Sequence, residues 1–297
     1  MLLLCVACLS VLGLLIAVWI YSHNDAHERP DPKPDLHPVP IAVIIPTLHE
    51  ETALSATIAR LFQAASASKE KGRDQPPAPA PTVIVVDAGR REDTSARLES
   101  LTAAHPTLHL LQYPGRPSRG AQLNYGAAQA AVITPQASIL LFLHADTHLP
   151  PAWDDAIRAS LSSPRPPVLG TFTLSLPPPI SPALQVMLWG ANRRARWGGM
   201  PYGDQGYFMM RRTFDAVGGF PGVPIMEDVE LLRRVSRDGR IAVLDDAVET
   251  SPRRWLQKGV VWNTVFNQAL IFAWMCRVPH ETIYGWYYGR QKRYKTA

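Results

Sequence analysis

The sequence predicts an α/β protein whose central sheet is mainly parallel. Strand-like and helix-like segments alternate through the first half of the chain, a pattern that gives parallel strands covered by helices on both faces. Polar or acidic residues directly follow three of the strand-like segments. The 297 residues are enough for one large domain or two ordinary ones with a buried core.

Periodicity and β-branched content place the elements of this fold. The predicted strands are 41–46, 82–87, 107–112, 139–146 and 168–176. The predicted helices between them are 52–69, 92–104 and 119–131. The second half is less regular, with a proline break at 177–179 followed by a helix over 182–196, a strand over 207–211 and a helix from about Met226.

The N-terminal segment has the length and composition of a membrane-spanning helix. Residues 2–21 carry no charge, and at about 1.5 Å per residue they match a hydrocarbon layer of roughly 30 Å. The charged leader and small-residue cleavage site of a signal peptide are missing, so we expect residues 1–21 to be a single-pass anchor. The flanking charges are mixed and leave the orientation open. Residues 22–40 hold five prolines and predict an extended stalk.

The C-terminal segment differs from the rest of the chain in charge. From residue 251 onward there are eight basic residues and one acidic residue, so a chain of net charge +5 is slightly acidic elsewhere. We expect residues 41–254 to form the soluble domain and residues 255–297 a basic, aromatic, membrane-associated tail. Nucleic acid is not an expected partner, because the basic excess is confined to this one segment.

An apolar stretch at 259–278 lies within this tail. Asparagine and glutamine recur in it at helical spacing, which predicts an amphipathic helix lying on a membrane or on the domain rather than a second span. The three cysteines are too few for a disulfide framework or a thiolate zinc cluster.

Polar residues at the ends of neighbouring strands predict a ligand site. Glu50 follows the first strand, Asp87 and Gly89 end the second, and His144 and Asp146 end the fourth. In an open α/β sheet the ligand lies beyond the carboxyl ends of the strands. Each residue alone could serve as a turn or a helix cap, but together they indicate one crevice.

These segments resemble a known enzyme family. IAVIIPTLHEE, VIVVDAGRREDT and LLFLHADTHLPP are similar, in order and spacing, to family 2 glycosyltransferases of the GT-A fold, which use nucleotide-diphosphate sugars. GRPSRGAQLNYGA (115–127), YGDQGYF (202–208), MEDVELLRR (226–234) and SPRRW (251–255) resemble the subgroup linked to arsenosugar biosynthesis. The resemblance covers about residues 41–290 and implies a GT-A domain over 41–254 followed by C-terminal amphipathic helices.

The resemblance implies a role for several residues on the donor side. Pro46 and Glu50 would line the nucleotide pocket, and Asp87, next to Gly89, would receive the base. A carboxylate suits that role because it accepts the imide N–H of uracil. The alternative for Asp87 is a turn-capping aspartate.

The diphosphate would lie between two further motifs. Arg119 and Asn124 open a helix whose N-terminus can receive phosphate oxygens, although Arg119 could instead be a solvated surface charge. Arg254 would clamp the diphosphate and Trp255 would stack under the acceptor. Their SPRRW motif resembles the QxxRW element of processive relatives, but Ser251 replaces the glutamine, which argues against polymer synthesis.

His144 and Asp146 occupy the place of the family's DxD metal motif. Asp146 is the expected ligand of Mn²⁺ or Mg²⁺, because carboxylate oxygen suits hard divalent cations. The first aspartate of the motif is replaced by His144, which would be a weak second ligand or a ribose contact.

The acceptor side carries the candidate base. Glu227 and Asp228 match the family's ED motif, and Asp228 would take the proton of the acceptor hydroxyl. The alternative is that both carboxylates only complement the helix dipole and pair with Arg233 or Arg234. Asp204 and Gln205, between glycines, would shape the acceptor side or form a hairpin turn.

The expected function is therefore metal-dependent, inverting transfer of one sugar at a membrane. The donor would be a nucleotide-diphosphate sugar, and the acceptor a small or lipid-linked hydroxyl compound. A nucleotidyltransferase is a second candidate, but it would need a glycine-rich phosphate loop with lysine at the first strand end. A catalytically silent nucleotide-sugar-binding membrane protein is a third, against which both Asp146 and Asp228 argue.

Overall fold

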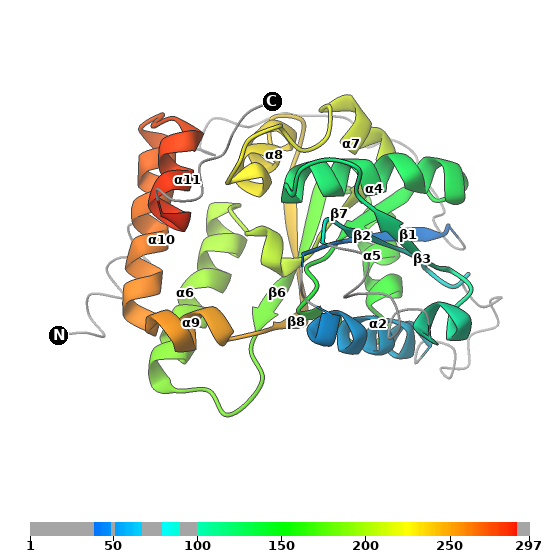
Figure 1. Cartoon of the computed structure of the whole chain (residues 1–297), viewed down its shortest axis with the longest axis horizontal. Coiled ribbons are helices and arrows are strands. Elements are labelled where there is room, and N and C mark those ends of the chain that lie inside the picture. Colours follow the sequence, from blue (N-terminus) through cyan, green and yellow to red (C-terminus); the bar gives the residue numbers. More distant parts are fainter. Residues whose placement is uncertain (1–38, 49–50, 67–78, 90–99, 290–297) are drawn as a thin grey trace.

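A computed structural model describes residues 39–48, 51–66, 79–89 and 100–289 of the chain (Figure 1). The predicted anchor 1–21, most of the stalk 22–40, Glu50 and the end of the tail from residue 290 lie outside the described residues. In the described part of the chain, no helix combines the length and the apolar composition that crossing a membrane requires.

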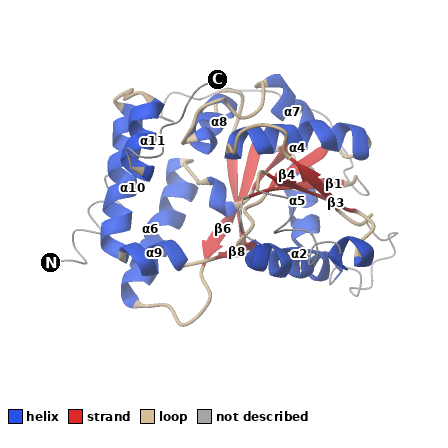
Figure 2. Cartoon of the chain, in the orientation of Figure 1, coloured by secondary structure: helices blue, strands red, loops and turns tan. Residues whose placement is uncertain are grey.

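One sheet forms the centre of the molecule (Figure 2). Its strands are β1 (Ile41–Thr47), β2 (Thr82–Asp87), β3 (Leu108–Gln112), β4 (Ile139–Phe142), β5 (Thr147–His148), β6 (Leu169–Ser175), β7 (Tyr207–Met210) and β8 (Ile241–Thr250). They lie in the order β3-β2-β1-β4-β7-β6-β8-β5. The polar strand ends of β1, β2 and β4 therefore come from adjacent strands, as the sequence predicts.

The sheet is mixed rather than purely parallel: in the described part of the chain, four strand pairings are parallel, as the prediction of a mainly parallel sheet requires, and three are antiparallel. β1 pairs in parallel with β2 and β4, β2 with β3, and β6 with β8. β7 runs antiparallel to β4 and β6, and β5 runs antiparallel to β8. β7 is reversed because the chain enters it from the edge where β4 ends, and the residues just before β7 consequently lie at that edge.

The helices lie where the sequence predicts them in the first half of the chain and are more numerous than predicted in the second. The helices that match predictions are α2 (Glu51–Ser66), α4 (Arg119–Ile133), α6 (Pro182–Gly198), α8 (Glu227–Val235) and α10 (Val260–Met275). Of the helix predicted over 92–104, residues 100–104 are described and helical. Further helices are α5 (Trp153–Leu161), α7 (Arg211–Ala216), α9 (Arg253–Lys258) and α11 (His280–Tyr288).

The fourth strand is shorter than predicted. β4 ends at Phe142, and the predicted continuation to residue 146 leaves the sheet. Leu143 still donates a backbone hydrogen bond to Ile44, at 3.0 Å. The carbonyl of Ala145 instead accepts from the hydroxyl of Thr57 on α2, at 2.7 Å, so the chain turns toward that helix.

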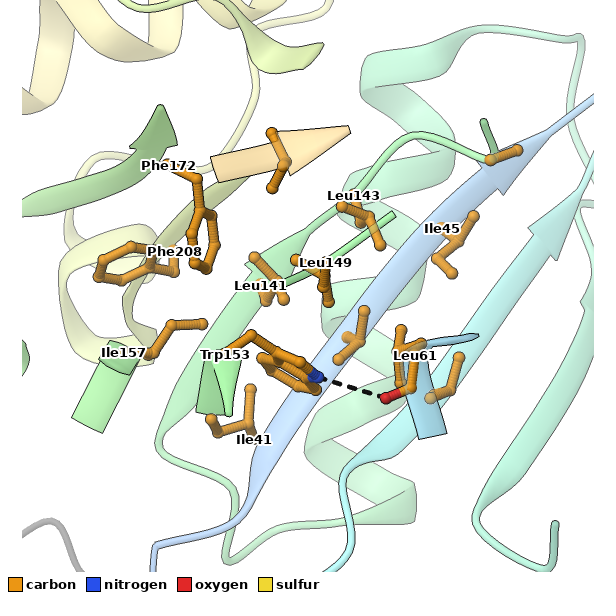
Figure 3. Packing of buried hydrophobic residues seen from close by; sticks show 14 of the residues in the cluster. Ile41, Ile45, Leu61, Leu141, Leu143, Leu149, Trp153, Ile157, Phe172 and Phe208 are labelled. Atoms are coloured by element: carbon orange, nitrogen blue, oxygen red, sulfur yellow. Dashed lines mark hydrogen bonds between the residues drawn. The ribbon is translucent and has the colours of Figure 1, made fainter. Parts of the chain in front are cut away.

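The core has two hydrophobic layers, one on each face of the sheet. Ile41, Val43 and Ile45 of β1 point into one layer, and Ala42 and Ile44 point into the other. β1 is buried on both faces, which explains its unbroken apolar sequence. Trp153 of α5 is fully buried in the first layer, where its indole N–H donates to the carbonyl of Leu61 at 3.3 Å (Figure 3).

Candidate functional site

A crevice lies at the edge where β1, β2 and β4 end. It is closed by the start of α4, the start of α8 and a short 3-10 turn, η2 (Gly203–Gln205). A small cavity there is lined by residues of α4, α8 and η2 together with the end of β4 and the start of β7, whereas β1 and β2 are not part of its lining. The polar and glycine members of its lining are Arg119, His144, Gly203, Glu227 and Asp228. Ligands bind at this edge of open α/β sheets.

Arg119 is the centre of the polar contacts in the crevice. It is the first residue of α4, and its Nε donates to the carboxylate of Glu227. Its Nη2 lies 3.4 Å from Oδ2 of Asp228. Arg119 is therefore no solvated surface charge: it holds two carboxylates that lie more than a hundred residues further along the chain.

His144 completes this cluster as a neutral imidazole. Its Nε2 lies 3.0 Å from Nη1 of Arg119, and because a guanidinium only donates, Nε2 must accept. Burial, and then the positive charges of Arg119 and Arg254, hold the pKa of His144 well below its usual value. For Arg119, burial lowers the pKa, but the charges of Glu227 and Asp228 outweigh it and raise the pKa above its usual value.

The carboxylate of Asp228 is held by backbone groups as well as by Arg119. Oδ2 accepts from the N–H of Gly203 at 3.0 Å, and Oδ1 accepts from the N–H of Val229 at 2.9 Å. A Cβ on Gly203 would lie 3.1 Å from Oδ2 of Asp228, so the absence of a side chain permits this close approach. Glu227 is 4% exposed.

The alternative pairing of the ED motif with arginines of its own helix does not occur. Arg233 forms an ion pair with Glu230 at 2.9 Å, and Arg234 donates to the carbonyl of Val217 at 3.3 Å. Both carboxylates of the motif instead face Arg119 across the crevice.

Asp204, in η2, is a carboxylate with a raised pKa. Burial raises its pKa to about 6; Arg194 opposes this rise and Asp228 adds to it. A carboxyl group with a pKa of about 6 is a stronger base than an ordinary aspartate. Gln205, also expected on the acceptor side, is fully buried and donates to the carbonyl of Phe172 at 2.8 Å, so it holds the turn in place.

Two side chains of α4 bind backbone rather than facing the crevice. Asn124 donates to the carbonyl of Phe220 at 2.8 Å and accepts from its N–H at 2.9 Å, which fixes the loop before α8. Gln122, which the sequence analysis missed, donates to the carbonyls of Thr47 and Val86 at 2.9 and 2.8 Å. It joins α4 to the ends of β1 and β2, and nothing in the sequence distinguishes it from a solvent-facing helical glutamine.

The predicted nucleotide end lies along β1 and β2. Pro46 pairs with Val86 in the parallel ladder, and Asp87 is 8% exposed. Oδ1 of Asp87 accepts from the N–H of Gly89 at 2.8 Å, as in the turn-capping alternative. Gln112 of β3 donates to the carbonyls of Asp87 and Gly89 at 3.0 and 2.9 Å, so a third strand supports this turn.

Asp146, the predicted metal ligand, follows β4 and is half-buried. Its carboxylate has no hydrogen-bond or ion-pair partner among the residues that the structure describes. In the same part of the chain, no three His, Cys, Asp or Glu side chains form a metal cluster. A cation that also binds substrate phosphates needs only one or two protein carboxylates, so the donor set fits such a cation.

Arg254 and Trp255 lie on α9, the first of the C-terminal helices. Arg254 is exposed on α9; its Nη1 lies 3.3 Å from the hydroxyl of Tyr287, and its charge acts on His144. Trp255 is half-buried and packs against the first hydrophobic layer. Tyr287, on α11, was not predicted as part of this region, because α11 itself is not distinct in the sequence.

Three solved structures resemble this fold. The mannosyltransferase PcManGT from Pyrobaculum calidifontis, in complex with GDP-Man and Mn²⁺, is 16% identical at a TM-score of 0.52, over 84% of this chain and 67% of its own. GalNAc-T7 with UDP, GalNAc and Mn²⁺ is 15% identical at 0.51, over 73% of this chain and 44% of its own. S. aureus TarS 1–349 is 16% identical at a TM-score of 0.49, over 78% of this chain and 65% of its own.

The first two structures confirm the fold. This chain has the α/β fold with a mixed sheet that is seen in glycosyltransferases of the GT-A type. Identities of this size show the fold alone. A scan against protein-family models finds no match, and a search of the curated proteins finds none.

Proposed function

We propose that the protein is a glycosyltransferase that transfers a sugar from a nucleotide-diphosphate donor to a hydroxyl acceptor. One observation carries the proposal: at the ligand edge of a GT-A sheet, Arg119 faces the carboxylates of Glu227 and Asp228. A guanidinium beside a helix N-terminus suits a diphosphate, and a carboxylate opposite it suits a hydroxyl that must lose a proton. The arsenosugar subgroup is the finer assignment that the motifs suggest.

The donor would occupy the edge from β2 to α4. Its base would lie at Asp87 and its diphosphate at the start of α4, where Arg119 provides charge-assisted hydrogen bonds. Arg254, exposed and without an ion-pair partner among the described residues, would approach the diphosphate from α9. PcManGT and GalNAc-T7 were solved with GDP-Man and with UDP and GalNAc, which supports a donor of this class.

A divalent cation fits the donor end of this site. Asp146 would hold Mn²⁺ or Mg²⁺, and the cation would supply charge stabilisation for the leaving diphosphate. His144 would first have to release Arg119, since its Nε2 accepts from that residue. We therefore assign Asp146 the ligand role and His144 a contact with Arg119 or with the donor.

Asp228 is the proposed base for inversion. Its carboxylate would accept the proton of the acceptor hydroxyl while the acceptor oxygen bonds to the anomeric carbon and the bond from that carbon to the diphosphate breaks. Attack opposite the departing nucleoside diphosphate inverts the configuration. Binding of diphosphate would draw Arg119 away from Asp228 and leave this carboxylate more basic.

Asp204 is a second candidate for the base. Its pKa of about 6 is closer to neutral pH than that of an ordinary aspartate, which favours proton transfer. It lies in the same turn as Gly203, whose N–H binds Asp228, and the charge of Asp228 adds to the rise of its pKa. Substituting each one separately, with a pH profile, distinguishes them.

The competing functions are separated by what happens to the donor. A nucleotidyltransferase would release pyrophosphate from a nucleoside triphosphate, and a silent binding protein would bind a nucleotide sugar without consuming it. We expect thermal shifts with one of the UDP, GDP or CDP sugars in the presence of Mn²⁺, followed by release of the nucleoside diphosphate. Consumption of a nucleoside triphosphate with pyrophosphate release would contradict the proposal.

The location at a membrane is part of the proposal. The uncharged segment 2–21 is long enough to span a bilayer, and the acceptor would then be lipid-linked or would diffuse to the membrane surface. Full-length protein should remain with membranes in carbonate. Its release, or a mature N-terminus beyond Tyr21, would contradict the anchor.

A further inference from the structure

Helix α10 exposes large apolar side chains to the surroundings, although it also packs another face against the core. Trp262 and Phe272 are 67% and 57% exposed, whereas Asn263 and Thr264 are 4% and 9% exposed. A soluble domain rarely leaves large apolar side chains grouped on one helix face unless something covers them.

The exposed side chains of α10 and the half-buried side chains of Val265 and Phe266 form one stripe. At about 100° per residue they fall within about 120° of the helix circumference, over a length of about 20 Å. None carries a charge. The α10 stripe consists of Trp262, Val265, Phe266, Ala269, Phe272 and Cys276.

The orientation of the stripe is fixed by contacts on the opposite side of α10. Leu270, Ile271 and Trp274 belong to the second hydrophobic layer of the core. The indole N–H of Trp274 donates to Oε1 of Glu230 on α8, at 2.8 Å. Most of the stripe therefore faces away from the domain, and Phe266 at its border also packs against the second layer.

Exposed basic residues precede and follow α10 in the chain. Arg253, Arg254 and Lys258 lie on α9, which precedes α10, and Arg277 follows it. Residues 251–289 contain these four basic residues and one acidic residue, Glu281. Exposed tryptophan and basic side chains around an apolar face are typical of protein surfaces that lie in the interface of an anionic bilayer.

We propose that the α10 stripe inserts into the interfacial layer of an anionic bilayer. Segment 2–21 of the same chain could cover the apolar atoms, but it has no charge to balance the flanking basic groups. A second copy of the chain would bring two basic surfaces together. In an anionic bilayer the acyl chains would cover the apolar stripe, and the lipid head groups would balance the charge of the basic residues.

Side-chain contacts connect the stripe to Arg254, near the candidate site. The ring of Phe266 stacks on that of Trp262, with centroids 6.5 Å apart, and on that of Tyr287, at 6.4 Å. The Tyr287 hydroxyl reaches Arg254, whose charge acts on His144 in the crevice. The consequence for the acceptor, which rests on the proposed function, is that a lipid-linked hydroxyl compound enters the crevice from the bilayer side.

A fluorophore at Cys276 tests the proposal in the full chain. The double substitution Cys5→Ser and Cys8→Ser leaves Cys276 as the one thiol. The labelled protein is reconstituted into phosphatidylcholine–phosphatidylglycerol vesicles with plain or brominated acyl chains. We expect a blue-shifted emission that the brominated lipid quenches, and weaker quenching when phosphatidylglycerol is omitted.

A matched control carries the label away from α10. Val132 is 76% exposed near the end of α4, a helix that lies on the other side of the molecule from α10 (Figure 1). Val132→Cys with Cys276→Ser, in the same background, should give emission that brominated lipid leaves unchanged. Trp262→Gln with Phe272→Gln should reduce quenching at Cys276, and the melting temperature of each protein verifies that it is folded.

Two results would overturn the proposal. Equal emission in plain and brominated vesicles would mean that the stripe does not meet lipid. A blue shift without bromine quenching would mean that protein, either segment 2–21 or a second copy, covers the stripe. The measurement uses no nucleotide sugar, so failure of the proposed transfer activity leaves its result unaffected.

Discussion

The guanidinium of Arg119 lies 3.4 Å from the carboxylate of Asp228, across the crevice at the ligand edge of the sheet. Arg119 is the first residue of α4 and Asp228 the second residue of α8, and Gly203 at η2 adds a backbone N–H to the same carboxylate. This arrangement places the residue proposed to bind the diphosphate next to the residue proposed as the base. Donor binding at Arg119 and proton transfer at Asp228 are therefore expected to influence each other.

Arg119→Lys should weaken donor binding while keeping the positive charge. Lysine cannot present the planar fork that bonds two phosphate oxygens, and one lost charge-assisted hydrogen bond is worth about 1.5–3 kcal/mol. We expect the affinity for the nucleoside diphosphate to fall by about tenfold or more, measured by calorimetric titration. Arg233→Lys, which affects a surface pair with Glu230, should leave it unchanged. Unchanged affinity in Arg119→Lys would remove this residue from the donor site.

Asp146→Asn should abolish the part of donor binding that depends on Mn²⁺. A neutral amide oxygen replaces the anionic ligand, so the metal no longer links the diphosphate to the protein. The readout is the Mn²⁺-dependent increase in melting temperature with nucleoside diphosphate. His144→Ala should reduce it less, and His148→Ala, whose ring lies near Arg60 and Glu249, should not change it. If His144→Ala is the more damaging change, the two roles are reversed.

Asp204→Asn should stabilise the protein in a pH-dependent way. The pKa of Asp204 is about 6 in the folded protein and near 3.8 ordinarily, so the folded state keeps a proton that the unfolded chain releases between these values. The contribution of Asp204 to the free energy of unfolding is complete below about pH 4 and is lost as the pH rises through about 6. The melting temperature of Asp204→Asn should match the wild type at pH 4 and exceed it at pH 7.

Asp215→Asn is the control for this titration, since Asp215 lies exposed on α7. This substitution removes one aspartate charge at the surface, and its melting temperature gives the effect of that loss alone at each pH. A pH-independent difference between Asp204→Asn and the wild type would contradict the raised pKa of Asp204. If Asp204→Asn also removes turnover together with an acidic limb near pH 6, then Asp204 is the base.

The sequence predicts the position of the crevice because strand ends are local features. Alternating strands and helices bring the carboxyl ends of β1, β2 and β4 to one edge, and Asp87, His144 and Asp146 follow from that pattern. The pairing of Arg119 with Glu227 could not be predicted, because it joins residues 108 positions apart through packing of α4 against α8. Long-range contacts of this kind depend on the whole fold.

β8 was missed for a physical reason as well. Asp245 and Asp246 lie within it, and aspartate is depleted in strands. The pairing of β6 with β8 shifts register between Phe172 and Thr173, so the two aspartates lie at an irregularity where β8 is exposed. The reversed direction of β7 likewise depends on where α6 returns the chain, which the hydrophobic pattern does not specify.

The most direct test of the central claim is the turnover of a nucleotide sugar by the wild type and by Asp228→Asn, with donor affinity measured on the same samples. Our account predicts that the wild type releases nucleoside diphosphate from one of the UDP, GDP or CDP sugars. Asp228→Asn should bind that donor normally but turn over roughly 10²–10⁴-fold more slowly, which is the usual value of general base catalysis. Asp215→Asn should behave as the wild type. Absence of binding to every donor, or turnover in Asp228→Asn within about threefold of the wild type, would contradict the account.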